Sequence, residues 1–437
     1  METRIREDDR EILRLAVPAF LALVAEPLFL LADSAIVGHL GTRQLAGLGI
    51  AGAVLSTLIS VCIFLAYGTT ASVARRIGAG DLRGALTQGI DGVWLAIVIG
   101  LGTTALGVPL TPWLVGLFGP GPEVADEAAT YLRIGVLGAV PLLVVLAVTG
   151  ILRGLQDTRT PLLVAVGGNL ANVVLNLWLV YGLDLGIAGS ALGTVIAQTG
   201  SAAVLVAVVM RAARRYDAPL RPSLEGIRGA GSAGIPLLLR TVTLRASLLV
   251  MTYGATTLGD TELATMQVAM TLWSFLAFAL DAIAIAAQAL TGRSLGAGDR
   301  DGTGRITRRM LRWGVVSGVV TGAALAVSSP WVGALFTEDA AVRHLLVSVL
   351  LVAAIAQPLA GVVFVLDGVL IGAGDGRYLA WAGLLVLAAF APTAWVAVEA
   401  GGGLVGLWVA FVVAFMGGRG VVLLRRAAGD AWMRLGA

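Results

Sequence analysis

Gly78-Ala79-Gly80-Asp81 returns in the second half of the chain as Gly296-Ala297-Gly298-Asp299. The same offset relates Pro112-Trp113 to Pro330-Trp331. The 437-residue chain therefore contains one half-length unit twice, almost without insertions. Because this unit is apolar along most of its length, the duplication is typical of a membrane transporter built from two similar halves around a central site.

The composition supports a membrane protein. The chain is 58% hydrophobic and 13% charged, with a mean hydropathy of +0.91, and long uncharged runs recur throughout. One cysteine, Cys62, and two distant histidines, His39 and His344, give no disulfide framework and no cysteine-based metal site. We expect no metal and no cofactor. The basic pI of 9.4 does not indicate nucleic acid, because the Arg residues cluster in short loops.

Clusters of Gly, Pro and charged residues divide the chain into twelve apolar segments, six in each half. The predicted spans are 13–37, 45–73, 88–110, 128–151, 161–182, 186–210, 231–256, 263–291, 310–332, 343–371, 378–399 and 403–424. We predict an all-α integral membrane protein with two six-helix lobes. The N-lobe is 1–215, a cytoplasmic linker is 216–230, and the C-lobe is 231–437.

The distribution of Arg predicts the orientation. Arg residues gather after the second, fourth and eighth spans, in the linker and at both termini. The positive-inside rule then places both termini in the cytoplasm. The first apolar stretch, roughly residues 12–37, is too long for a signal-peptide core, so we predict that it is the first span. The predicted location is the plasma membrane of a bacterium.

Two acids lie inside the first span. Glu26 and Asp33 are seven residues apart, which is two helical turns, so they share one helix face. An ionised side chain at the centre of a span costs about 2.5–3.5 kcal/mol, which makes function the default hypothesis. Within the first six predicted spans, basic residues occur only near the ends of two of them, Arg14 in the first and Arg133 in the fourth. Low dielectric disfavours the charged carboxylate, so we expect Asp33 to take up and release protons.

Amide and hydroxyl side chains lie at the depth of Asp33. Asn172 and Asn176 are four residues apart on the fifth span, and Thr194 lies on the sixth. These residues could line one pocket in which Asp33 is the only charge. The alternative is that they form interhelical hydrogen bonds and nothing more.

The second half carries a different set of charges within its spans. Arg240 and Arg245 lie on the seventh span, Asp281 on the eighth and Asp367 on the tenth. Two Arg can neutralise two Asp, which predicts a structural ion-pair network. A second coupling or substrate site is the functional alternative, and the sequence leaves both open.

Three stretches carry a resemblance to a known family. They are AEPLFLLADSAIVGHLG at 25–41, LDAIAIAAQAL at 280–290 and LDGVLIGAGD at 366–375. The chain resembles the multidrug and toxic compound extrusion (MATE) family over nearly its whole length, and these stretches are similar to the first, eighth and tenth helices of its DinF-like branch. The resemblance implies a secondary antiporter in which two lobes form a V and rock around a central site. Its substrates would be small organic, often cationic and amphipathic compounds. By fold analogy we expect a monomer.

The resemblance also implies roles for individual residues. Asp33 stands at the place of the family's coupling acid, and Asn172 and Thr194 match further members of that pocket. Some members have an acid where this chain has Asn176, and the seventh span has no acid at 239–245. Both departures favour H+ over Na+ as the coupling ion, although Na+ stays possible. Asp367 matches a cation-site acid of another branch.

Two other functions are consistent with parts of the sequence. A flippase for a lipid-linked saccharide would need cationic side chains to hold a pyrophosphate, and only Arg240 and Arg245 favour it. An integral-membrane transferase would need a paired-Asp metal motif within a span, and no such pair occurs. We therefore predict that the chain is a transporter and not an enzyme.

Overall fold

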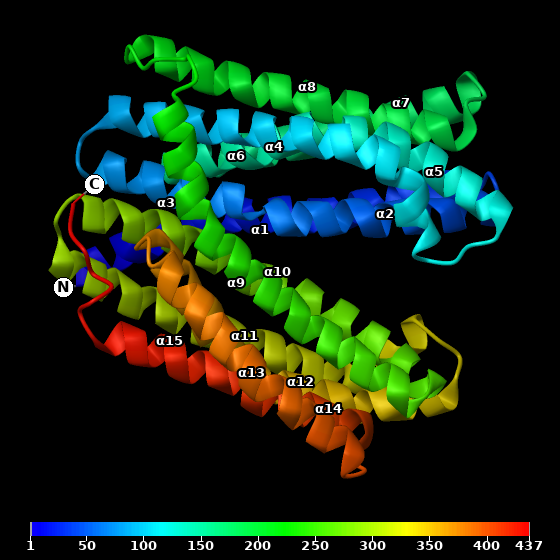
Figure 1. Cartoon of the computed structure of the whole chain (residues 1–437). Coiled ribbons are helices and arrows are strands. Elements are labelled where there is room, and N and C mark those ends of the chain that lie inside the picture. The colour runs from blue at the N-terminus through cyan, green and yellow to red at the C-terminus, as the bar shows by residue number, and fades with distance from the viewer. Residues whose placement is uncertain (1, 437) are drawn as a thin grey trace. The chain divides into compact units, whose positions relative to one another are not determined.

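The structure is a computed structural model that describes residues 2–436, which form helices joined by turns and loops and contain no β-strand (Figure 1). Within these residues, eleven helices or directly joined helical segments are long and apolar enough to cross a membrane. One further pair, Pro122–Leu137 and Ala139–Gly154, is bent by 49° and makes a twelfth span if counted as one. The predicted all-α fold with twelve spans is confirmed, and each predicted span lies within one of these helices or within the bent pair.

The chain divides into two compact units. Unit 1 is Met1–Phe20 with Pro236–Ala437, and unit 2 is Leu21–Ile235. Two long helices, α1 (Glu2–Gly38) and α9 (Leu224–Leu258), contribute to both. The other elements of unit 2 are α2 (Thr42–Cys62), α3 (Phe64–Gly78), α4 (Leu82–Gly116), α5 (Pro122–Leu137), α6 (Ala139–Gly154), α7 (Arg159–Leu177), η1 (Trp178–Gly182) and α8 (Gly186–Arg215).

Unit 1 contains the spans of the second half of the chain. Its elements besides α1 and α9 are α10 (Asp260–Gly296), α11 (Arg300–Val332), η2 (Gly333–Leu335), α12 (Ala340–Gly372), α13 (Gly376–Glu399), α14 (Gly403–Ala410), η3 (Phe411–Gly417) and α15 (Gly418–Ala428). Two of these elements, η1 in unit 2 and η3 in unit 1, are π-helical.

The two units differ from the predicted lobes at the start of the chain. Residues 1–20 were predicted in the N-lobe, yet they belong to the unit of the second half. Ion pairs explain this assignment, because Asp9 binds Arg309 and Glu11 lies 2.8 Å from Arg293. Trp313 also donates to Asp9 at 2.8 Å. Since α1 is continuous, no break in the sequence marks the change of unit.

The predicted linker 216–230 is also shorter in the structure. Helix α9 already begins at Leu224, where the Ser223 hydroxyl accepts a hydrogen bond from the Gly226 N–H at 3.2 Å. A serine at this position satisfies an N–H group that the first helical turn leaves unpaired. The helix therefore begins well before the predicted seventh span.

The repeated tetrapeptide forms the same turn twice. Gly80 and Gly298 adopt positive φ angles of 76° and 74°, which glycine accommodates without strain. Asp81 then caps α4 by accepting from the Gly84 N–H at 2.8 Å, and Asp299 caps α11 in the same way. The Gly84 N–H and the Arg76 guanidinium hold the pKa of Asp81 below its ordinary value. The tetrapeptide thus recurs because it ends one span and starts the next.

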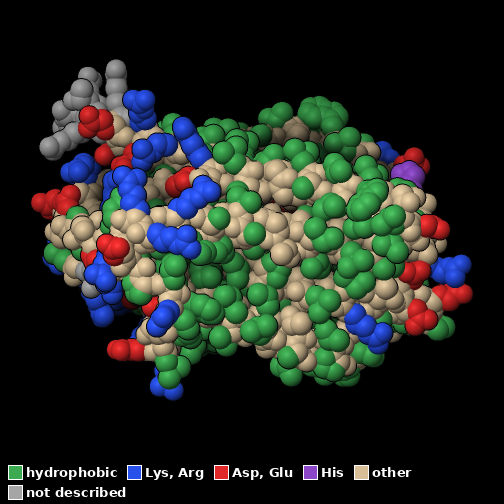
Figure 2. Space-filling model, turned by 90° about the horizontal axis from the view of Figure 1, so that it is seen from above, with side chains coloured by type: hydrophobic (Ala, Val, Ile, Leu, Met, Phe, Trp, Pro, Cys, Tyr) green, Lys and Arg blue, Asp and Glu red, His purple; other side chains and the backbone are tan. Residues whose placement is uncertain are grey.

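Charged side chains lie mostly at the ends of the helices. On the face drawn in Figure 2, Arg side chains gather at one end, whereas the middle carries hydrophobic side chains and backbone. This distribution suits helices that cross a bilayer. The predicted cytoplasmic location of both termini stays a prediction.

A stripe of glycines brings α11 and α12 into close contact. Gly314, Gly318 and Gly322 follow at four-residue spacing, and a Cβ on Gly314 would lie 2.6 Å from the Gly361 carbonyl oxygen. The hydrophobic effect does not hold helices together inside a bilayer. Close packing of the two backbones at small residues stabilises the α11–α12 contact instead.

We expect Gly318→Val to destabilise the chain by about 2–3 kcal/mol, because the new side chain meets the backbone at Gln357 and Pro358 and the helices must separate. Heat unfolding of the purified protein in detergent measures the loss. Gly304→Val is the matched control on α11, since a Cβ at Gly304 meets nothing within 4 Å. Equal midpoints for the two variants would contradict the role of the stripe.

Candidate functional site

Asp33 lies at the centre of a buried hydrogen-bond network in unit 2. Its side chain is 4% exposed. Its Oδ1 accepts from Asn176 Nδ2 at 2.8 Å and from Ser190 Oγ at 2.7 Å. Tyr131, on α5, donates to Oδ2 at 3.4 Å. Three donors around one carboxylate stabilise its charged form.

The other predicted residues of this pocket adjoin the network. Asn172 Nδ2 donates to Thr194 Oγ1 at 3.0 Å, and Thr194 in turn donates to the Ser190 carbonyl at 3.0 Å. The structure therefore brings together Asp33, Asn172, Asn176 and Thr194, as the sequence predicted from their depth. Their roles in coupling stay a prediction.

Sequence reasoning missed two residues of this network, Tyr131 and Ser190. Ser190 precedes Thr194 by four residues, so helical spacing places it on the same face and could have found it. Tyr131 gives no comparable signal. It reaches Asp33 only because α5 packs beside α2 and α8 in unit 2.

The network also contains acceptors that the charged carboxylate leaves unused. Among the described residues, Asn172 Oδ1 and Asn176 Oδ1 are buried without a hydrogen-bond partner. Buried acceptors of this kind are uncommon and call for an explanation. A rotation of the Asn176 amide would present Oδ1 to Asp33 in place of Nδ2. The same side chains could then serve a protonated Asp33, whose O–H needs an acceptor.

Glu26 does not join this network. Its side chain is exposed, whereas that of Asp33 is buried, although both lie on α1. Seven residues correspond to about 10 Å along a helix, which separates the two carboxylates in depth. The shared face predicted from their spacing therefore does not make them one site.

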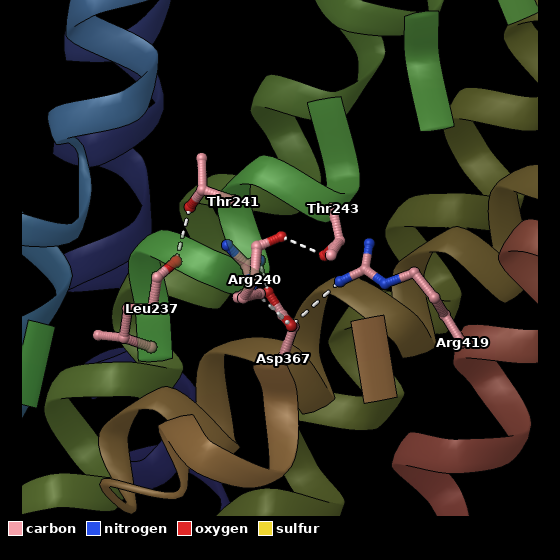
Figure 3. Close-up of polar contacts among 6 residues, drawn as sticks. All are labelled: Leu237, Arg240, Thr241, Thr243, Asp367 and Arg419. Atoms are coloured by element: carbon pink, nitrogen blue, oxygen red, sulfur yellow. Dashed lines mark hydrogen bonds and ion pairs between the residues drawn. The ribbon is translucent and has the colours of Figure 1, made fainter. Parts of the chain in front are cut away.

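A second buried polar cluster lies in unit 1. Arg240, on α9, donates through Nε and Nη2 to both oxygens of Asp367, on α12 (Figure 3). Arg419, on α15, donates through one nitrogen to Asp367 Oδ1 at 3.0 Å. All three side chains are about nine-tenths buried. One carboxylate is thus shared by two guanidinium groups, which form one wall of a small pocket.

The other predicted charges of this half occupy different positions. Asp281 interacts electrostatically with Arg419, whereas Arg245 is exposed. Sequence reasoning missed Arg419, although it lies inside the predicted span 403–424 and an Arg within a span is itself a signal. The predicted set of two Arg and two Asp therefore omitted Arg419.

The Asp33 network has no equivalent in unit 1. At the offset that relates the two copies of the tetrapeptide, Asp33 corresponds to Met251 and Asn172 to Phe390. Met251 and Phe390 are both fully buried. The duplicated unit thus keeps the helices and replaces the polar side chains.

The last helix of each unit shows the same replacement. Gly186, at the start of α8, and Gly403, at the start of α14, have matching φ angles of 54° and 57°. We therefore align the last spans of the two units from these glycines onward. In this region the offset between the two copies is one residue shorter than for the tetrapeptide. Thr194 then corresponds to Phe411. The rings of Phe390 and Phe411 meet edge to face at 6.1 Å, where unit 2 has a hydrogen bond. An aromatic core therefore fills this part of unit 1.

Twelve apolar spans, an internal duplication and buried ionisable side chains in both units define a multi-pass membrane transporter. The family profile described as MatE matches residues 18–178 and 236–396, two ranges that are related by the offset of the tetrapeptide. The chain belongs to the MATE family of transporters, as its resemblance predicted.

Relatives and a solved structure are similar over most of the chain. Protein DETOXIFICATION 44, chloroplastic, from Arabidopsis thaliana is 30% identical over 98% of this chain and 82% of its own length. DNA damage-inducible protein F from Escherichia coli (strain K12) is 30% identical over 84% of this chain and 82% of its own. The structure of a multidrug resistance MATE family transporter in its outward-facing conformation superposes with a TM-score of 0.87, at 24% identity over 96% of both chains.

Proposed function

We propose that this chain is a secondary active efflux antiporter for small organic, often cationic and amphipathic compounds, driven by protons that bind Asp33. The observation that carries the proposal is the network around Asp33, a buried acid with three donors for its charged form and a nearby acceptor for its neutral form. The likeness to a multidrug resistance transporter supports the substrate class.

The mechanism follows from the two forms of Asp33. The charged carboxylate holds Asn176, Ser190 and Tyr131 together and orders α1, α5, α7 and α8 around it. A proton removes the charge and weakens these three hydrogen bonds. Protonation then favours an arrangement from which substrate leaves, and the lobes rock between outward- and inward-facing states. Coupling requires that proton and substrate stabilise different states.

Protons suit this network better than Na+. Within residues 2–436, no group of three or more His, Cys, Asp or Glu side chains could hold a metal ion. Asp33 is the one acid in its network, so a Na+ site would depend on neutral oxygens for most of its ligands. We propose H+ as the coupling ion and no cofactor, in a monomer with both termini in the cytoplasm of a bacterium.

Reconstituted liposomes test this function. The expected result is efflux of a fluorescent organic cation under an imposed pH gradient, without Na+. Efflux driven by a Na+ gradient alone would overturn the proton proposal. A lack of transport under both gradients would contradict the antiporter and favour a lipid-linked saccharide flippase, for which Arg240 and Arg419 offer cationic groups.

A further inference from the structure

Positive charge is concentrated where α8 ends and α9 begins, in unit 2. Residues 211–228 contain five Arg and two acids, a net charge of +3 that equals the formal charge of the whole chain. We call the five Arg side chains the linker surface, and all of them are exposed: Arg211, Arg214, Arg215, Arg221 and Arg228. They lie at one end of two membrane-spanning helices, and the proton mechanism does not use them.

The linker surface lacks acidic partners. Among the described side chains, none of its five guanidinium groups forms an ion pair with a carboxylate. Elsewhere in the chain, exposed Arg at helix ends do have such partners, as Arg43 has in Glu123 at 3.0 Å. Arg211 and Arg215 are four residues apart on α8, a spacing at which like charges weaken a helix. An anion from outside the chain would remove this repulsion.

The Arg side chains of α8 continue an apolar exposed face. Val204 and Ala207 are exposed and precede Arg211 by seven and four residues, so the three share one side of the helix. Ala213, on a different side, is fully buried. Tyr216 is exposed directly after the helix, and Tyr is enriched at the depth of lipid headgroups. Apolar side chains that suit acyl chains thus lead directly to guanidinium groups that suit headgroups.

The connection between α8 and α9 is held in place. Trp94 Nε1 donates to the Leu220 carbonyl at 3.0 Å, and the Ala218 N–H donates to the Ala213 carbonyl at 2.9 Å. Ala213 and Ala218 are buried in the apolar core of unit 2. Arg221 follows directly after the anchored Leu220. Because this backbone is already ordered, binding to the linker surface would cost little backbone entropy.

We propose that the linker surface binds the phosphate groups of anionic phospholipids, such as phosphatidylglycerol. Guanidinium groups form charge-assisted hydrogen bonds with phosphate oxygens. A cluster of four to eight basic residues next to a membrane span is typical of anionic-lipid recognition. The exposed apolar face that leads to Arg211 favours a lipid over a soluble phosphate. This interaction is separate from proton coupling at Asp33.

Native mass spectrometry of the full-length protein tests this surface. Phosphatidylglycerol and phosphatidylcholine with the same acyl chains are matched probes, and the measurement gives an apparent dissociation constant for each. We expect Arg214→Gln to weaken phosphatidylglycerol binding about fivefold, the contribution of one basic residue near an anionic membrane surface. Phosphatidylcholine binding should stay unchanged. Arg214→Lys keeps the charge and should bind phosphatidylglycerol nearly as the wild type does.

Arg43→Gln is the matched control. Arg43 is exposed and lies in unit 2 like Arg214, but Glu123 already neutralises it. We expect this variant to bind both lipids as the wild type does. Equal losses in the two Gln variants, or equal losses of both lipids in Arg214→Gln, would overturn the proposal.

A second variant changes the anchored connection instead of α8. We expect Arg221→Gln to weaken phosphatidylglycerol binding to a similar extent, and it decides alone if Arg214→Gln does not fold. High salt should weaken the same binding, because 1 M salt shortens the range of electrostatic attraction to about 3 Å. Binding that ignores both Arg221→Gln and salt would contradict a charged surface.

Glycerol 1-phosphate distinguishes a lipid from a soluble phosphate. It carries a phosphate group without acyl chains, so we expect that it does not displace phosphatidylglycerol at equal concentration. Displacement would show that the surface takes soluble phosphates and would overturn the assignment to a lipid. Because binding is measured without an ion gradient, its failure is separate from a failure of proton-driven efflux.

Discussion

Asp33→Asn abolishes proton-driven efflux and leaves the protein folded. Asn has the shape of Asp and can still accept hydrogen bonds from Asn176 and Ser190 through its Oδ1. It cannot bind and release a proton, so the variant lacks the change between protonated and charged side chain on which coupling depends. The expected efflux rate in liposomes with an imposed pH gradient is that of empty liposomes.

The stability of this variant changes little. Loss of charge-assisted hydrogen bonds is offset by removal of a buried charge, so we expect a difference of less than about 1 kcal/mol in unfolding free energy. The matched control is Asp184→Asn in the same unit. Asp184 is exposed with a positive φ of 55°, a conformation that Asn also tolerates. Normal efflux by the Asp33 variant would remove this residue from the coupling mechanism.

Asp367→Asn destabilises the protein by about 3–5 kcal/mol, the cost of leaving buried charges without their partner. Its carboxylate is the shared acceptor of Arg240 and Arg419, whose side chains are only 11% exposed. Without it, two guanidinium groups face each other across low dielectric and repel. The midpoint of heat unfolding in detergent should fall clearly below that of the wild type.

Two further variants make this prediction specific. Asp375→Asn breaks one comparable pair, with Arg426, at a helix end that water can reach, and should cost about 1 kcal/mol or less. Combining Asp367→Asn with Arg419→Gln removes one of the two repelling charges and should restore part of the stability. If Asp367→Asn costs no more than Asp375→Asn, the cluster does not stabilise unit 1.

Some features of this molecule can be predicted from the residue order within a single helix. The repeat, the spans and the depth of Asp33 depend only on residue order, because apolar length and helical spacing are properties of a single segment. The same reasoning placed Asn172, Asn176 and Thr194 near Asp33, since all four were counted from the same end of their spans. Charge counting within the spans also located Arg240 and Asp367.

Other features depend on which helices pack together. Tyr131 joins the Asp33 network across 98 residues of sequence, and Glu26 is left out of it although it shares a helix with Asp33. The first twenty residues belong to the unit of the second half through ion pairs about 300 residues apart in sequence. Contacts of this kind leave no periodic pattern in either segment.

The sequence by itself determined that this chain is a duplicated twelve-span transporter with a buried acid in its first span. Only the tertiary structure decided that Asp33 is held by three donors, that Arg240 and Arg419 share Asp367, and that Phe390 and Phe411 fill the place that Asn172 and Thr194 occupy in the other unit. The physical reason is that hydrophobicity acts along each segment and sets its place in the bilayer. Hydrogen bonds and ion pairs act over a few ångströms, between side chains that only packing brings together.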